Sequence, residues 1–195
     1  MHNFFGKKKS EQKSRRALFG TMLAFGIIGL IASFVLAVEE FNLLKNPDAI
    51  LSCSFNLVLN CAAVMQTSEA SVFGFPNMFI GLMGFPVVIT IALLGLSNVK
   101  LPRWFLIGAQ IGIGLGALSA FWLFFSSVYT IQVLCPWCLI VTLSLTMLLA
   151  TITRYNIVQG TFRLARKYDK VFRKIFEQDY DKLVVAAWIV MLVAL

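Results

Sequence analysis

The sequence predicts an all-α membrane protein built as a bundle of four transmembrane helices. Composition is the first reason: 59% of the 195 residues are hydrophobic and only 13% are charged, whereas soluble domains are about half apolar and about a quarter charged. The second reason is that four apolar stretches are long enough to cross a bilayer, which takes about 20 residues. The third is the uneven distribution of Lys and Arg along the chain, which is typical of multi-pass membrane proteins.

The four expected spans are separated by connections of unequal length. They cover residues 17–38, 75–96, 104–129 and 134–153. The third span contains a GxGxG run at 112–116, where we expect another helix to approach closely. This run lies inside an apolar span, so it is not interpreted as a nucleotide-binding loop.

The positive charges predict an orientation. Six of the 17 Lys and Arg residues lie in the tail 1–16, two in 98–103 and eight in 154–182, but only Lys45 follows the first span before the second begins. Because cytoplasmic segments are enriched in Lys and Arg, these three segments are expected to face the cytoplasm and the loop 39–74 to face outward. The net charge of +8 is then explained without nucleic acid as a partner.

The chain after the fourth span contains two further segments. Apolar residues recur at helical spacing through 154–182 and are surrounded by basic ones, which predicts either a basic amphipathic helix on anionic lipid or an ordinary linker helix. Residues 183–195 are apolar but too few to span a bilayer, so we expect a partial fifth helix or an interfacial segment. The predicted transmembrane domain is therefore 17–153.

All four cysteines lie in segments that are expected to face outward, where disulfides form and persist. Cys53 and Cys61 fall in the loop 39–74, and Cys135 and Cys138 form a CPWC motif at the start of the fourth span. In this motif Cys135 is a plausible N-cap and the following proline occupies the first helical position. The helix N-terminus then favours thiolate over thiol.

Three kinds of chemistry are compatible with cysteines in these positions: a zinc site, static disulfides and a redox relay. A zinc site needs four ligands at suitable spacing, but the spacing of Cys53 and Cys61 is wide and the only histidine is His2. No metal is therefore expected. A pair of static disulfides and a redox relay both remain open. A relay at the membrane edge needs an acceptor for two electrons, and a lipid-soluble quinone, menaquinone or ubiquinone, is the natural candidate.

Two stretches carry a family resemblance: CSFNLVLNCAAVMQTSEASVFGFPN at 53–77 and LCPWC at 134–138. Together they closely resemble bacterial homologues of vitamin K epoxide reductase, particularly the actinobacterial type, over about 20–150. The resemblance implies a four-helix bundle around a quinone, with a helix in the outer loop forming a lid.

The resemblance also implies roles for the cysteines. Cys135 and Cys138 would be the active-site pair, with Cys138 facing the quinone and Cys135 exchanging with Cys61. Cys53 would meet a thioredoxin-like partner, which must be a separate protein because the domain fused in some members is absent.

Further site residues follow from the same resemblance. Asn77 matches the asparagine that hydrogen-bonds the quinone carbonyl, although it could be a turn residue after Pro76. Thr67 stands where the family usually has a serine, or it is a capping hydroxyl. Met65, Phe73 and Phe75 line the quinone or pack the lid, and Trp137 is a wall of the site or an interface anchor. Glu39, Glu40 and Asp48 are expected to be solvated loop charges.

The sequence thus predicts a thiol:quinone oxidoreductase that generates disulfides. It would oxidise an extracytoplasmic thioredoxin-like protein from a bacterial cytoplasmic membrane, with its N-terminus in the cytoplasm. Two alternatives stay open: a non-catalytic membrane scaffold with structural disulfides, and a quinone-epoxide reductase with the reverse electron flow.

Overall fold

In a computed structural model of the chain, residues 2–46, 51–54, 59–161, 186 and 190 are described. The long elements in this part are α1 (His2–Lys45), α3 (Met78–Leu96), α4 (Arg103–Ser126) and α5 (Pro136–Val158). Within the described residues there are four helices long and apolar enough to cross a membrane. The predicted all-α architecture with four transmembrane helices is confirmed.

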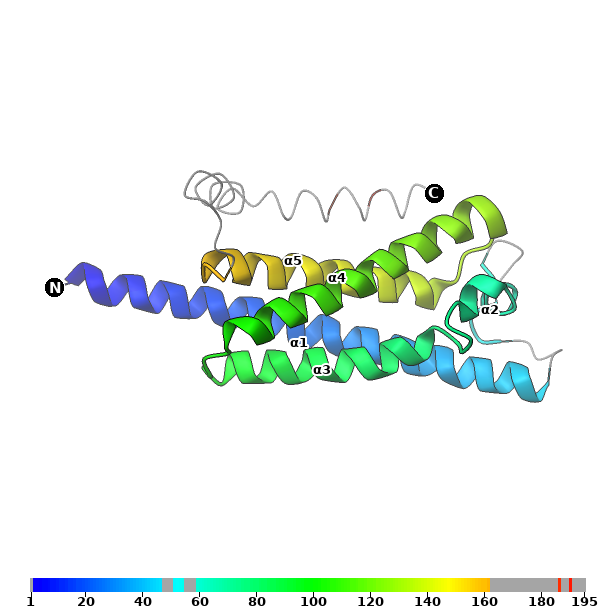
Figure 1. Ribbon diagram of the computed structural model, residues 1–195, viewed down its shortest axis with the longest axis horizontal. Coiled ribbons are helices and arrows are strands. Elements are labelled where there is room, and N and C mark those ends of the chain that lie inside the picture. Colours follow the sequence, from blue (N-terminus) through cyan, green and yellow to red (C-terminus); the bar gives the residue numbers. More distant parts are fainter. Residues whose placement is uncertain (1, 47–50, 55–58, 162–185, 187–189, 191–195) are drawn as a thin grey trace.

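Short elements join the long helices at one end of the bundle. They are α2 (Cys61–Met65), the 3-10 helix η1 (Ser68–Ser71) and the π-helical turn η2 (Ser127–Ile131), which extends α4. Figure 1 shows α2 at the end of the bundle where α1 finishes and where α3 and α5 begin. The α3–α4 connection and the last turn of α5 lie at the opposite end.

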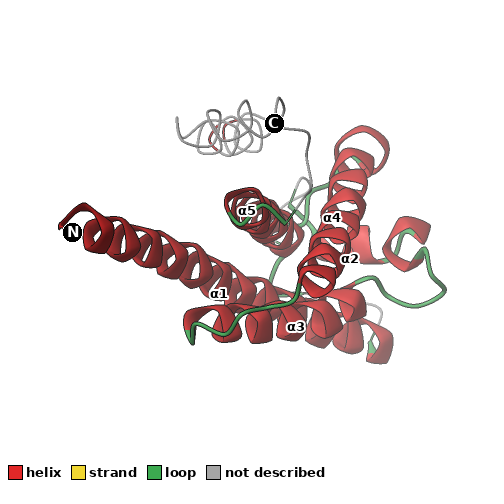
Figure 2. Cartoon of the chain, turned by 60° about the vertical axis from the view of Figure 1, so that its left-hand side comes forward, coloured by secondary structure: helices red, strands yellow, loops and turns green. Residues whose placement is uncertain are grey.

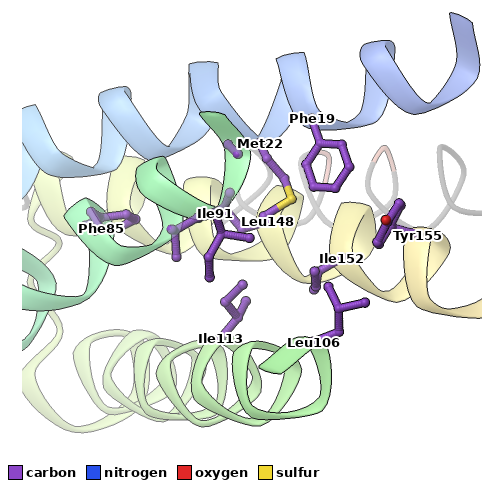
Figure 3. Packing of buried hydrophobic residues seen from close by; sticks show 11 residues of the cluster. Phe19, Met22, Phe85, Ile91, Leu106, Ile113, Leu148, Ile152 and Tyr155 are labelled. Carbon is purple, nitrogen blue, oxygen red and sulfur yellow. The ribbon is translucent and has the colours of Figure 1, made fainter. Parts of the chain in front are cut away.

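The helices pack in the order α3, α1, α5, α4, with α1 against both α3 and α5 and with α4 against α5. Figure 2 shows the long first helix crossing beside α3, with α5 on its other side. Their apolar side chains meet in one cluster, here called the helix core (Figure 3). Its buried members are Phe19, Met22, Phe85, Val88, Ile91, Ala92, Leu106, Ile113, Leu148, Ile152 and Tyr155.

Glycines let α1 and α3 approach closely. A Cβ on Gly29 would overlap the ring of Phe85, and a Cβ on Gly95 would overlap the ring of Phe19. Small residues at helix contacts in a membrane serve this purpose. The GxGxG run behaves differently from expectation, because a Cβ on Gly112 or Gly114 would meet nothing within 4 Å and only Gly116 faces a neighbour, Leu145.

Two arginines secure the end of the bundle opposite α2. The Arg15 guanidinium donates to the Gly95 carbonyl oxygen at 3.3 Å and also to the side chain of Asn98. Arg103 donates at 2.9 Å to the carbonyl oxygens of Gly160 and Thr161. Cations are favourable beside the unsatisfied carbonyls at helix C-termini, so positive charge and helix ends stabilise each other here.

The segment after α5 lies largely beyond the described residues. Gly160 has a positive φ of 63°, a conformation that glycine adopts without steric cost, and it follows the C-terminus of α5. The predicted amphipathic helix within 154–182, from residue 162 onward, and the predicted partial helix 183–195, apart from residues 186 and 190, fall outside the described part. The predicted domain boundaries therefore stay predictions.

Candidate functional site

Three of the four cysteines gather in a second buried cluster, here called the cysteine cluster, at the α2 end of the bundle. Its buried members are Leu36, Leu43, Leu51, Cys53, Cys61, Val64, Met65 and Cys135. Trp137 and Cys138 are partly buried and pack against it. Side chains from α1, the 51–54 segment, α2 and the start of α5 thus enclose the sulfur atoms.

The sulfur atoms are arranged as two pairs in contact. Cys53 and Cys61 form a disulfide with their Cα atoms 5.7 Å apart, whereas Cys135 and Cys138 are free thiols. The Cys61 sulfur lies 3.2 Å from the Cys135 sulfur. The two pairs, 74 residues apart in sequence at this contact, are therefore close enough for thiol–disulfide exchange, in which one sulfur attacks another directly.

Backbone pairing explains why the outer disulfide sits beside the CPWC motif. Leu59 and Leu134 form an isolated parallel β-bridge, and the Asn60 N–H donates to the Leu134 carbonyl oxygen at 3.1 Å. These contacts fix the residues immediately before Cys61 and Cys135 against each other. The sulfur contact is thus held by main-chain geometry as well as by apolar packing.

Asn60 has a second role as the N-cap of α2. Its Oδ1 accepts from the Ala63 N–H at 3.3 Å and from the Ser54 hydroxyl at 2.9 Å. Asn is a preferred N-cap because its side chain satisfies an N–H group that the helix leaves unpaired. The side chain therefore links the helix that begins with Cys61 to the residue after Cys53.

The CPWC motif adopts the predicted helix start. Cys135 is the N-cap of α5, Pro136 follows at the first helical position, and the Cys138 N–H donates to the Cys135 sulfur at 3.4 Å. A hydrogen bond from the Cys138 thiol lowers the pKa of Cys135, and backbone N–H groups of Cys138 and Trp137 lower it further, while burial acts in the opposite direction. Cys135 is thus the sulfur of this pair whose thiolate is stabilised.

Asn77 lies at the beginning of α3, where its amide is only partly used. Its Nδ2 donates to the Glu69 carbonyl oxygen at 2.7 Å, and its backbone N–H donates to the Ala70 carbonyl oxygen at 2.9 Å. Its Oδ1 is buried and has no hydrogen-bond partner among the described residues. One amide N–H and the amide oxygen are therefore free to meet a ligand.

Thr67 and the aromatic residues occupy different environments. Thr67 is the N-cap residue of η1 without a side-chain capping hydrogen bond, and its hydroxyl donates instead to the Val64 carbonyl oxygen of α2 at 2.8 Å. Met65 is buried in the cysteine cluster. Phe73 and Phe75 are instead 62% and 40% exposed, with ring centroids 6.3 Å apart, and neither belongs to the helix core or to the cysteine cluster.

Two acidic residues, Glu39 and Glu40, contradict the prediction that they are solvated loop charges. Glu39 was expected to be a solvated loop charge, yet it lies within α1 and only 8% of it is exposed. Its carboxylate accepts from the Ser52 N–H at 3.2 Å and from the Ser52 hydroxyl. The spacing of Leu36, Glu39 and Leu43 could have revealed this, because positions three and seven residues apart share one helix face.

Glu40 departs from the same expectation, since it also belongs to α1 and its Oε2 is buried without a hydrogen-bond partner among the described residues. Asp48 lies outside the described residues. No group of three or more His, Cys, Asp or Glu side chains in the described part could hold a metal ion.

Comparison with known families gives one match. The model of the vitamin K epoxide reductase family matches residues 21–153, which include α3 and α4, the C-terminal part of α1 and all but the last residues of α5. A search of curated proteins finds no match.

Proposed function

Because the chain belongs to the vitamin K epoxide reductase family, we propose that it is a membrane thiol:quinone oxidoreductase that generates disulfides. Its substrate would be the dithiol of a separate thioredoxin-like protein on the outer side of the membrane. Electrons would pass through the Cys53–Cys61 pair to the Cys135–Cys138 pair, and then to a quinone. Because this family consists of oxidoreductases, we expect the protein to be an enzyme.

The contact between Cys61 and Cys135 is the observation that carries this proposal. Their sulfur atoms lie 3.2 Å apart, and one of them belongs to a disulfide while the other is a free thiol whose pKa is lowered. Two disulfides that only stabilise the fold do not have to contact each other. Exchange between two pairs does require one, because it passes through a mixed disulfide.

The proposed relay has four exchange steps. A partner thiolate attacks the Cys53 sulfur, the Cys53–Cys61 bond breaks, and Cys61 leaves as a thiolate. When Cys135 and Cys138 are joined, Cys61 attacks Cys135, and Cys138 leaves as a thiolate. The partner's second thiol then attacks the partner sulfur that is bound to Cys53, so the partner leaves oxidised and Cys53 is released as a thiolate. Cys53 finally attacks Cys61, the Cys61–Cys135 bond breaks, and Cys135 leaves as a thiolate. The outer disulfide is thereby restored and the two electrons reside on the inner pair, which is the pairing of the cysteines in this structure.

The free groups of Asn77 fit a quinone. A bound quinone would accept two electrons and two protons and leave as the quinol. The second N–H of the Asn77 amide can donate to a ligand carbonyl oxygen, and its unpartnered Oδ1 can accept from a ligand hydroxyl. Asn77 begins α3 at the same end of the bundle as the start of α5 (Figure 1), so both the amide and Cys138 belong to that end.

The distribution of charge supports an orientation for this relay. Arg15 and Arg103 lie at the end of the bundle opposite the cysteine cluster, where they bind helix C-termini. Basic residues favour the cytoplasmic side, so the cysteines would face outward, into a compartment where disulfides persist. We propose the cytoplasmic membrane of a bacterium as the location.

The test uses the full chain in detergent with a short-chain quinone and a reduced thioredoxin-like protein. The proposal predicts loss of quinone absorbance that depends on the protein substrate and is abolished by Cys138→Ser. A scaffold with structural disulfides would give no quinone reduction at any substrate concentration. That outcome would refute the proposed function.

A further inference from the structure

The outer disulfide is closed to a soluble partner in this structure. Only 1% of Cys53 is exposed, and Cys61 and Cys135 are equally inaccessible. A partner thiolate must approach the Cys53 sulfur along the disulfide axis, so the segment that carries Cys53 has to move before the proposed relay can begin. Whatever holds this segment therefore controls access of the partner.

Both chain neighbours of Cys53 are held by side-chain hydrogen bonds. Ser52 donates its N–H and its hydroxyl to Oε1 of Glu39 on α1. On the other side, the hydroxyl of Ser54 donates to Oδ1 of Asn60, the N-cap of α2. The residue before Cys53 is thus bonded to α1, and the residue after it is bonded to the N-cap of α2, the short helix that begins with Cys61.

The restraint on the Ser52 side is the stronger of the two because its acceptor is a carboxylate. Hydrogen bonds to an ionised group are roughly twice as strong as neutral ones. Glu39 is also buried, and a buried carboxylate is costly unless donors satisfy it; the described donors to Glu39 both come from Ser52. Release of Ser52 would leave this carboxylate without them, which favours the closed position.

We propose that Glu39 is a positioning residue that holds Cys53 buried through Ser52, so that breaking this contact sets how readily a partner dithiol reaches the outer disulfide. This inference deepens the proposed function and rests on it for the identity of the partner. The contact forms no covalent bond and carries no electrons; it shifts the balance between a closed and an open position of Cys53.

The experiment measures reduction of the Cys53–Cys61 disulfide by excess dithiothreitol in the full chain, in detergent. The background is Cys135→Ser with Cys138→Ser, so that the inner pair cannot reoxidise the outer one. When opening is fast relative to reaction, the rate follows the population of the open form. Glu39→Ala removes both hydrogen bonds from Ser52 and should accelerate reduction by roughly tenfold or more, since losing even one charge-assisted hydrogen bond has an effect of about that size.

Matched variants separate positioning from a general loss of structure. Glu39→Gln keeps an oxygen that can accept from Ser52 but loses the charge, so its rate should lie between those of the background and Glu39→Ala. Ser52→Ala removes the hydroxyl donor alone and should give a smaller acceleration than Glu39→Ala. Glu40→Ala is the control, because it alters the adjacent carboxylate, whose Oε2 has no partner among the described residues, and it should leave the rate unchanged.

Equal reduction rates for Glu39→Ala and the unsubstituted background would overturn the inference, as would equal acceleration by Glu40→Ala. If Glu39→Ala protein does not fold, Ser52→Ala provides the same comparison without removing a carboxylate. The assay contains neither quinone nor protein partner. Its failure is therefore distinguishable from failure of the proposed function, which the quinone assay tests independently.

Discussion

The helix core and the cysteine cluster are both buried, but they are built from different parts of the secondary structure. The helix core joins apolar side chains from the interiors of four long helices. The cysteine cluster joins the ends of helices to short connecting segments, and it depends on the Leu59–Leu134 bridge, the Asn60 cap and the Glu39–Ser52 contact. The positions of its sulfur atoms therefore depend on a small number of specific hydrogen bonds.

Because the two clusters are built differently, substitutions in them should have different effects on stability and on reactivity. Substitutions in the helix core remove packing that many side chains share, so they should lower the stability of the bundle and leave the sulfur chemistry intact. Substitutions in the cysteine cluster change one atom or one hydrogen bond at the point of exchange. They should alter reactivity far more than they alter stability.

The largest expected effect is loss of the relay in Cys135→Ala. The substitution removes the sulfur that Cys61 contacts, so quinone reduction by the protein substrate should fall to background, a decrease of about a thousandfold or more for loss of a nucleophile that acts as part of a unit. Steady-state quinone absorbance measures it. Ser144→Ala is the control, since Ser144 is buried in the same helix and bonds only within it; equal inactivation by both variants would contradict the distinction between the two regions.

The next effect is on stability in the helix core. Leu148 is fully buried in α5, and Leu148→Ala should lower the free energy of unfolding by about 2–5 kcal/mol, because a cavity remains where packing was lost. Denaturant titration in detergent measures this change, with Leu148→Met as the volume-conserving control. The protein that remains folded should keep its turnover, and a loss of turnover without a loss of stability would contradict the separation.

A smaller effect is expected where α1 meets α3. In Gly29→Ala the added methyl group would overlap the Phe85 ring, so this variant should be destabilised by about 1–3 kcal/mol. Gly112→Ala has open space around the new methyl group and should be neutral or stabilised by about 0.5–1 kcal/mol, since alanine favours a helix. Thermal unfolding of both variants under one condition compares them, and the same sign of change in both would argue against the packing described.

The most subtle effect concerns the pH dependence of Cys135. The Cys138 thiol is the largest cause of its lowered pKa, so Cys138→Ala should raise the pKa of Cys135. The Cys135 thiolate would then form only at higher pH, which ultraviolet thiolate absorbance during a pH titration can follow. Cys138→Ser keeps a hydroxyl donor and should lie between the two; a titration that does not change in Cys138→Ala would show that this hydrogen bond has no influence.

The helices were predictable because apolar length alone signals a transmembrane span. Each predicted span overlaps the corresponding helix, and the main differences are in α1, which begins at His2, before the predicted span, and continues through Glu39 and Glu40 to Lys45. Charged residues suggested a loop there, yet Leu36 and Leu43 keep one face of the helix apolar and packed against the cysteine cluster. At the end of α1, hydrophobic periodicity predicts the helix correctly, whereas the charged residues do not.

The site was predictable only in part. The helix start at CPWC follows from proline and capping preferences, and the structure has it. The proximity of Cys61 to Cys135 came from family resemblance, because no periodicity relates segments 74 residues apart. The contacts that fix this geometry, at Ser52 and Asn60, are polar bonds between distant segments, which composition and spacing do not reveal.

A direct trapping measurement tests the central claim that the two cysteine pairs exchange through Cys61 and Cys135. In the double variant Cys53→Ser with Cys138→Ser, Cys61 and Cys135 are the two cysteines that remain, and mild oxidation should join them in nearly every molecule, as seen by mass spectrometry of the linked peptides. The companion variant Cys61→Ser with Cys138→Ser should form its Cys53–Cys135 link much less. Free, separately alkylated Cys61 and Cys135 after oxidation, or equal linking in both variants, would contradict the account.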